Sequence, residues 1–94
     1  MIVLNVTYQC KPGMREAFLE RIQAEGIDAA SRAEAGNLQY DYFLPFDDSG
    51  DLLLVEKWKD AEALSAHGKL PHFAKLGTFK AQYIDETLID RFEV

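Results

Sequence analysis

The chain has 94 residues, 48% of them hydrophobic and 28% charged, which is typical of one small globular domain and excludes a disordered or fibrous chain. Ten Lys and Arg against 16 Asp and Glu give a net charge of −6, which disfavours nucleic acid and anionic membranes as partners. The single cysteine, Cys10, excludes an intrachain disulfide and a cysteine-based zinc site, and it is consistent with a cytoplasmic location.

Polarity patterns along the chain predict four strands and three helices. Stretches that alternate in polarity and are rich in β-branched and aromatic side chains are typical of strands, and apolar residues three to four apart are typical of helices. No basic segment precedes the first stretch, so neither a signal peptide nor a membrane span is expected. The expected elements are strands over 2–10, 37–46, 51–59 and 82–94, and helices over 14–35, from 60 onward and over 72–77.

Four residues are expected to shape the helices. Gly26 is expected to bend or interrupt the first helix, and Gly36 suits the left-handed position that follows its last residue. Asp60 is a good N-cap for the second helix. Pro71 is expected to end that helix and to start the short third one.

The order of these elements predicts an α+β, ferredoxin-like fold of the β-α-β-β-α-β type, with a single domain over residues 1–94. Its four-stranded antiparallel sheet would carry the helices on one face. The run 52–55 is apolar at every position, so the other face also presents apolar side chains. A second copy packed sheet to sheet is the simplest cover for that face, so we expect a homodimer.

Three segments of the chain resemble the antibiotic biosynthesis monooxygenase family. They occur in the family's order, and together with the predicted fold between them the resemblance covers nearly the whole chain. The segments are Glu34–Asp41 (EAGNLQYD), Val55–Leu64 (VEKWKDAEAL) and Ala66–Phe73 (AHGKLPHF).

The resemblance implies a dimeric α+β barrel and, as in many members, oxidation of quinols or phenols without metal, flavin or haem. It is nearest to the branch of quinol monooxygenases and quorum-signal isomerases. The haem-degrading branch has an iron-ligating histidine that aligns near Gly77, where this chain has none. We therefore expect no cofactor.

Glu56 and Trp58 are candidate site residues because a strand period of two places them on one face. Burial beside Trp58 would raise the pKa of the Glu56 carboxyl toward the range useful for proton transfer. A structural carboxylate paired with Arg or Lys is the alternative interpretation of Glu56.

His67 and His72 are the two histidines of the chain and its first acid/base candidates. On one continuous helix the two rings would lie about 140° apart, which argues against a shared metal ion, so no metal site is expected. A break at Pro71 could still turn both rings toward one pocket. His72 is the first choice for the base, because the positive end of a helix keeps a ring there neutral. A surface position is the alternative for each histidine.

Further side chains could bind a flat substrate ring in the cleft between helices and sheet. Trp58, Tyr40 and Phe73 offer aromatic surface, although core packing is the better explanation for most of the aromatic side chains. Asn5 interrupts an apolar strand with an amide that could hold a substrate oxygen or pair with a neighbour.

The leading functional hypothesis is a cofactor-independent monooxygenase that oxidises an electron-rich ring, such as a quinol or phenol, with O2. One alternative is an acid/base isomerase of a small phosphorylated or sugar-like carbonyl compound, as in quorum-signal processing. Another is a non-catalytic dimeric module that binds a ligand.

Overall fold

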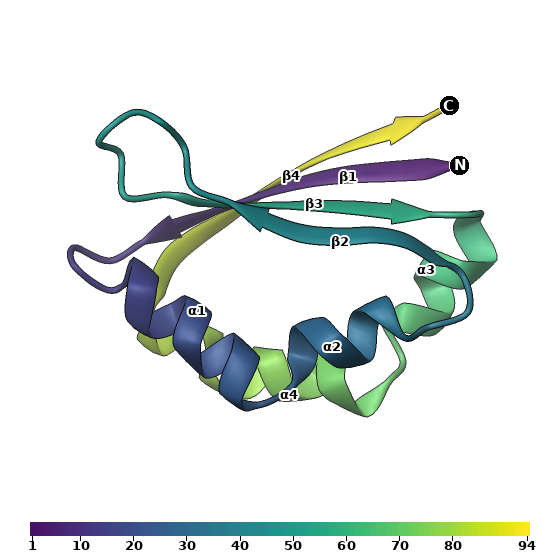
Figure 1. Ribbon diagram of the computed structural model, residues 1–94, viewed down its shortest axis with the longest axis horizontal. Coiled ribbons are helices and arrows are strands. Elements are labelled where there is room, and N and C mark those ends of the chain that lie inside the picture. Colours follow the sequence, from purple (N-terminus) through teal and green to yellow (C-terminus); the bar gives the residue numbers. More distant parts are fainter.

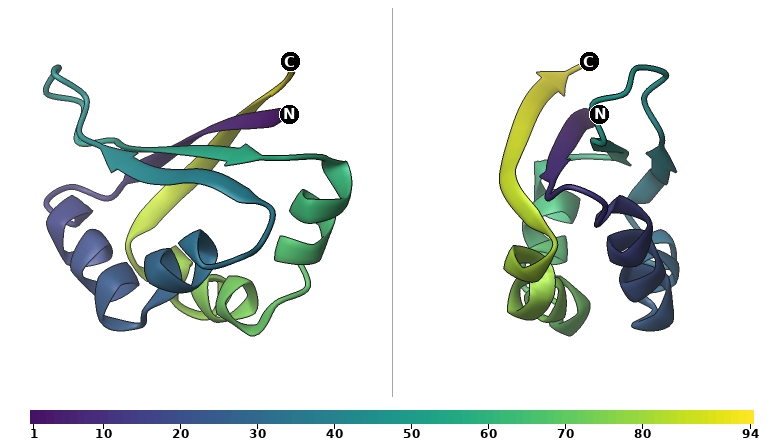
Figure 2. Two further views of the ribbon diagram at one scale, coloured as in Figure 1. Left: turned by 45° about the vertical axis from the view of Figure 1, so that its right-hand side comes forward. Right: turned by 90° about the vertical axis from the view of Figure 1, so that its left-hand side faces the viewer.

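A computed structural model describes all 94 residues and shows a four-stranded sheet with a layer of helices on one side (Figures 1 and 2). The strands are β1 (Ile2–Cys10), β2 (Asn37–Phe43), β3 (Leu52–Trp58) and β4 (Ile84–Glu93). The helices are α1 (Arg15–Ala24), α2 (Ile27–Arg32), α3 (Ala61–His67) and α4 (Pro71–Phe79), followed by the 3₁₀ turn η1 (Lys80–Gln82). None of these helices is long and apolar enough to cross a membrane.

The sheet is antiparallel throughout, in the order β2-β3-β1-β4, which confirms the predicted ferredoxin-like α+β fold. The pairing of β1 with β3 shows which side chains share a face. The pairs turned toward the helices are Ile2–Trp58, Leu4–Glu56 and Val6–Leu54, and the pairs on the outer face are Val3–Lys57, Asn5–Val55 and Thr7–Leu53.

The inner face of the sheet and the helices enclose one hydrophobic core. Phe18 and Ile22 of α1 and Ile27 of α2 are fully buried in it. The apolar run of β3 divides between the two faces, because Leu54 is fully buried whereas Val55 on the outer face is only half-buried. The helices thus cover one face of the sheet and leave the other open.

Three of the four helix-shaping predictions are confirmed. Gly26 adopts a left-handed φ of 70° and separates α1 from α2. Asp60 caps α3, since its Oδ1 accepts a hydrogen bond of 2.8 Å from the backbone N–H of Ala63. Pro71 begins α4, and Leu70 before it is extended because the proline ring disfavours helical backbone at the preceding residue.

The prediction for Gly36 is wrong. Its φ is not positive, and α2 ends earlier, at Arg32. Gly36 is buried in the turn directly before β2, where a Cβ atom would overlap the Cβ of Ala63 in α3. Glycine is required here because this turn and α3 approach each other closely, and not because the helix ends in a left-handed residue.

Candidate functional site

A cavity of about 270 Å³ lies between the inner face of the sheet and helices α3 and α4. Its walls are mostly apolar, with a few polar groups, among them Glu56 and His67. This is the usual character of a site for a small organic ligand. The lining residues are Leu4, Val6, Tyr8, Glu56, Leu64, His67, Gly68, Phe73, Leu76, Gly77, Lys80, Thr87 and Ile89.

Glu56 presents a buried carboxyl to this cavity from β3. Its Oε1 accepts a hydrogen bond of 3.1 Å from Nε1 of Trp58 and lies 4.0 Å from Nε2 of His67. Burial raises the pKa of Glu56 above its ordinary value of 4.5, while the Trp58 N–H and the nearby His67 ring oppose the shift. A carboxyl in this environment can carry a proton at a higher pH than an exposed one.

His67, the last residue of α3, is held between two carboxyl groups. Its Nδ1 lies 2.6 Å from Oε2 of Glu34, and its Nε2 is directed toward Glu56. The ring also packs on Trp58 and Phe73, with centroid separations of 4.6 and 5.3 Å. Only 5% of the side chain is exposed, so the ring has a fixed orientation at the cavity wall.

The break between α3 and α4 brings His72 to the same carboxylate. Its Nε2 lies 2.8 Å from Oε2 of Glu34, the oxygen that also contacts His67. The two rings are therefore not separated by 140° around one continuous helix, because α3 ends at His67 and Leu70 is extended. The alternative interpretation, a break at Pro71 that turns both rings to one place, describes the structure.

Glu34, His67 and His72 are the residues that could hold a metal ion. Their ligand atoms all lie within 4.8 Å of one another. Both rings already hydrogen-bond to the carboxylate, so a cation would have to compete with the protons in those bonds. That the chain carries no metal stays a prediction.

The other candidates occupy different places. Phe73 lines the cavity. Trp58 and Tyr40 are buried beside His67 but do not line the cavity. The centroids of the Tyr40 and His67 rings are 6.0 Å apart. Burial and the nearby Glu56 raise the pKa of Tyr40 to about 12, so its hydroxyl stays protonated. Asn5 pairs with Val55 on the outer face, and the structure does not bring it to the cavity.

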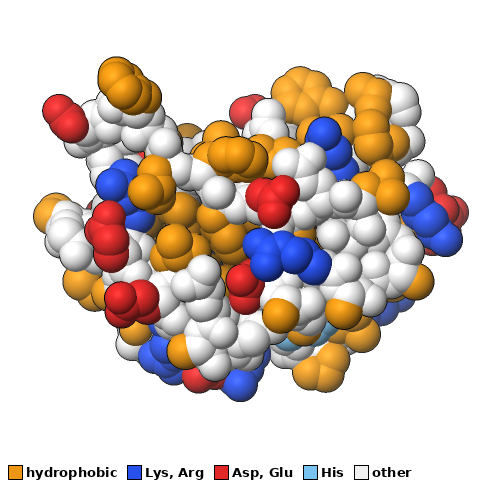
Figure 3. Space-filling view, in the orientation of Figure 1, with side chains coloured by type: hydrophobic (Ala, Val, Ile, Leu, Met, Phe, Trp, Pro, Cys, Tyr) orange, Lys and Arg blue, Asp and Glu red, His pale blue; other side chains and the backbone are white.

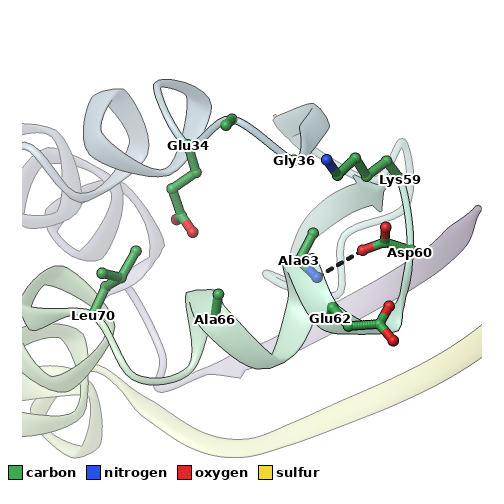
Figure 4. Close-up of a pocket in the computed structure, with 9 residues that line it drawn as sticks. Glu34, Gly36, Lys59, Asp60, Glu62, Ala63, Ala66 and Leu70 are labelled. Atoms are coloured by element: carbon green, nitrogen blue, oxygen red, sulfur yellow. Dashed lines mark hydrogen bonds between the residues drawn. The ribbon is translucent and has the colours of Figure 1, made fainter.

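Sequence reasoning missed Glu34, which the structure places in the loop between α2 and β2. It is the first residue of the segment EAGNLQYD, and that position is the signal that could have identified it. Its carboxylate also reaches into a surface groove of about 470 Å³ between α3 and the turn that precedes β2 (Figure 4). Because Glu34 contacts Nδ1 of His67 and Glu56 lies nearest to Nε2, the two carboxyl groups are on opposite sides of the ring.

The sequence is similar to those of known monooxygenase-family proteins. The family model described as antibiotic biosynthesis monooxygenase matches residues 1–77. A curated relative from Bacillus subtilis (strain 168), described as "Putative monooxygenase YcnE", is 41% identical over 73 residues, which are 78% of this chain and 75% of the relative.

Solved structures share the fold over almost the whole chain. PA3566 from Pseudomonas aeruginosa is 32% identical with a TM-score of 0.87, covering 99% of this chain and 92% of that one. Rv0793 from Mycobacterium tuberculosis, at 21% identity and a TM-score of 0.87 over 99% and 93% of the two chains, shares the fold. The match over residues 1–77, the relative and the common fold lead to one conclusion: the chain belongs to the antibiotic biosynthesis monooxygenase family.

Proposed function

We propose that this protein is a cofactor-independent monooxygenase that oxidises a quinol or another electron-rich phenol with O2 in the cavity between sheet and helices. One observation carries the proposal, namely the placement of Glu56 and His67 together at the wall of a mostly apolar cavity. Acid/base groups and a dry pocket are what such a reaction requires of the protein. Membership in the family supports the oxygen chemistry.

The substrate itself can supply the electrons for this reaction. Removal of a phenolic proton gives an electron-rich phenolate that can pass an electron to O2. When a quinol becomes a hydroxyquinone, one oxygen atom enters the ring and the other leaves as water, and the ring supplies all four electrons. The protein's part is to take the phenolic proton and to return a proton to the departing oxygen.

His67 and Glu56 suit these two steps in the proposed mechanism. Nε2 of His67 lies on the side of the ring that faces Glu56, and both residues line the cavity, so this nitrogen is positioned to accept the phenolic proton. Glu56, whose pKa is raised by burial, can hold a proton and donate it to an oxygen on the substrate. His72 does not line the cavity, so the proposal assigns the role of base to His67.

We also propose that the outer face of the sheet packs against a second copy of the chain. Figure 3 shows hydrophobic side chains gathered along the margin of the molecule where Figure 1 places the sheet. Phe43, Leu88 and Phe92 are each about half exposed there, beside the half-buried Val55. Contact with an identical face in a two-fold dimer would remove this apolar surface from water.

Oxygen uptake tests the proposed reaction. Purified protein is mixed with a panel of quinols and phenols, the uncatalysed oxidation is subtracted, and the product is checked by mass spectrometry for one added oxygen atom. Consumption no faster than the uncatalysed rate across the panel would reject the proposal. Turnover of a carbonyl compound without O2 would support the isomerase alternative instead, because that reaction uses acid and base without an oxidant.

A further inference from the structure

We propose that Glu34 is a positioning residue for His67, which it holds as the tautomer with its proton on Nδ1 so that Nε2 is free to accept a proton in the cavity. The catalytic meaning of this inference rests on the proposed function. Its structural content does not, because the tautomer of His67 can be measured without turnover.

The contact between Glu34 and His67 determines which ring nitrogen carries the proton. Oε2 of Glu34 and Nδ1 of His67 are 2.6 Å apart, a short separation that indicates a hydrogen bond to a charged group. An ionised carboxylate only accepts hydrogen bonds, so Nδ1 must donate. A neutral imidazole has a single N–H, and Nε2 is therefore the nitrogen with the free lone pair.

The surroundings of Nε2 leave that lone pair available. Its nearest carboxyl oxygen, Oε1 of Glu56, is 4.0 Å away, too far for a hydrogen bond. The same Oε1 accepts the N–H of Trp58. Since His67 is almost fully buried against Trp58 and Phe73, its ring cannot turn over without losing both the packing and the bond to Glu34.

The fold holds Glu34 in place from the side opposite the cavity. Gly36 packs against Ala63, so the turn before β2 lies directly on α3, and the Glu34 side chain extends into the groove between them (Figure 4). His72 contacts the same Oε2 at 2.8 Å and so restrains the carboxylate. His67 therefore stands between a carboxylate on the groove side and Glu56 on the cavity side.

This placement gives Glu34 a role without contact to substrate. A carboxylate behind an imidazole keeps the ring in one tautomer and orientation and stabilises the positive charge that forms when the other nitrogen takes a proton. Glu34 does not line the cavity, so its loss should change the rate of the chemical step and leave substrate binding almost unaffected.

The decisive measurement is the nitrogen resonances of His67 in the full-length chain labelled with ¹⁵N-histidine, at a pH where the rings are neutral. We expect a protonated Nδ1 and an unprotonated Nε2 in the native chain. Glu34→Ala should lose this pattern, whereas Glu34→Gln should keep part of it, because the amide oxygen still accepts. Glu62→Gln, in the wall of the same groove but without contact to either ring, is the matched control.

A native His67 with its proton on Nε2, or an unchanged pattern in Glu34→Ala, would overturn the inference. The native chain alone supplies the first of these results, so the test does not depend on the folding of a variant. Circular dichroism shows whether Glu34→Ala is folded.

Kinetics separates the inference from the proposed function. With an active substrate, Glu34→Ala should lower kcat by about 10- to 100-fold and change KM by less than about threefold, with partial rescue in Glu34→Gln. Full activity in Glu34→Ala would reject the positioning role and leave the monooxygenase proposal intact. A native chain without oxygen uptake would reject the monooxygenase proposal, and the tautomer measurement would still decide whether Glu34 holds His67.

Discussion

The indole N–H of Trp58 donates a 3.1 Å hydrogen bond to Oε1 of Glu56 from two residues further along the same face of β3. Both side chains are buried, and the bond supplies one polar partner to a carboxyl that has lost most of its contact with water. Because hydrogen bonding favours the charged form of Glu56 while burial disfavours it, Trp58 limits how far the pKa of Glu56 rises. Trp58 therefore tunes an acid/base group at the cavity without lining the cavity itself.

Replacing Trp58 with Phe should separate this tuning from bulk packing. Trp58→Phe removes the donor to Glu56 and leaves a small void, so the free energy of unfolding should fall by about 1–3 kcal/mol. The pKa of Glu56 should rise further, because the bond that favours its charged form is lost. Urea unfolding measures the first effect, and a carboxyl ¹³C titration measures the second. A fall in the pKa of Glu56 would contradict this account.

Glu56→Gln should make stability less dependent on pH. The unfolded chain releases the Glu56 proton near the ordinary pKa of 4.5, whereas burial makes the folded chain retain it to higher pH. The wild type therefore loses stability as the pH rises from that value through the raised pKa of the folded state, and the variant does not.

The measurement is the free energy of unfolding of Glu56→Gln and of wild type at about pH 4 and at about pH 8. The difference between the two proteins should shift in favour of the variant from the lower to the higher pH. Glu62→Gln, which changes an exposed carboxyl, is the matched control and should show no such shift. If the difference in free energy of unfolding between Glu56→Gln and wild type is the same at both pH values, the pKa of Glu56 is not raised in the folded state. On a substrate, Glu56→Gln should lower the rate by about 10²–10⁴-fold.

The two histidines should differ in their importance for catalysis. His67 lines the cavity, so His67→Ala should lower kcat by about 10²–10⁴-fold. His72 contacts Glu34 outside the cavity lining, so His72→Ala should cost less than about tenfold, by loosening the carboxylate behind His67. Steady-state kinetics of the two variants checks the order. A greater loss in His72→Ala than in His67→Ala would return the role of base to His72.

The sequence predicts the fold well because its elements are set locally. Alternating polarity marks the strands, and Asp60 and Pro71 mark the starts of α3 and α4 through side-chain capping and backbone restriction. The shared face of Glu56 and Trp58 follows from the strand period alone. Each of these features depends on residues only a few positions apart.

The parts of the site that sequence patterns do not predict depend on contacts between distant segments. Glu34 reaches His67 across 33 positions of the chain, a distance over which local patterns carry no information. Asn5 is an exception, because the polarity alternation of β1 already places it with Thr7 on the outer face, opposite Leu4 and Val6. Gly36 has the sequence context of a helix end, although the reason for a glycine there is the packing of the turn before β2 on α3.

The dimer proposal predicts that a charge on the outer sheet face will give a monomer. Val55 is half-buried at the centre of that face, so Val55→Arg should place an unpaired charge in the contact between two copies. Light scattering at micromolar concentration should give twice the chain mass for wild type and the single mass for Val55→Arg. Glu62→Arg, on α3 and away from the sheet face, is the control and should remain dimeric. A wild-type mass of one chain would refute the proposal.

Two glycines should respond in opposite directions to the same substitution. At Gly36 a Cβ atom would overlap the Cβ of Ala63, so Gly36→Ala must push the turn before β2 away from α3 and should lower the free energy of unfolding by about 1–3 kcal/mol. Gly77 lies inside α4, and a Cβ atom there would meet nothing within 4 Å. Gly77→Ala should therefore stabilise the chain by about 0.5–1 kcal/mol through helix propensity. Urea unfolding of both variants tests this pair.

The same two variants also test what holds Glu34 behind His67. Because the close approach of the turn before β2 to α3 at Gly36 places the Glu34 carboxylate, Gly36→Ala should weaken the Nδ1–H pattern of His67, whereas Gly77→Ala should leave it unchanged. Equal stability of the Gly36→Ala variant and wild type would show that this turn can yield without cost. The close contact would then not be what holds Glu34 in place.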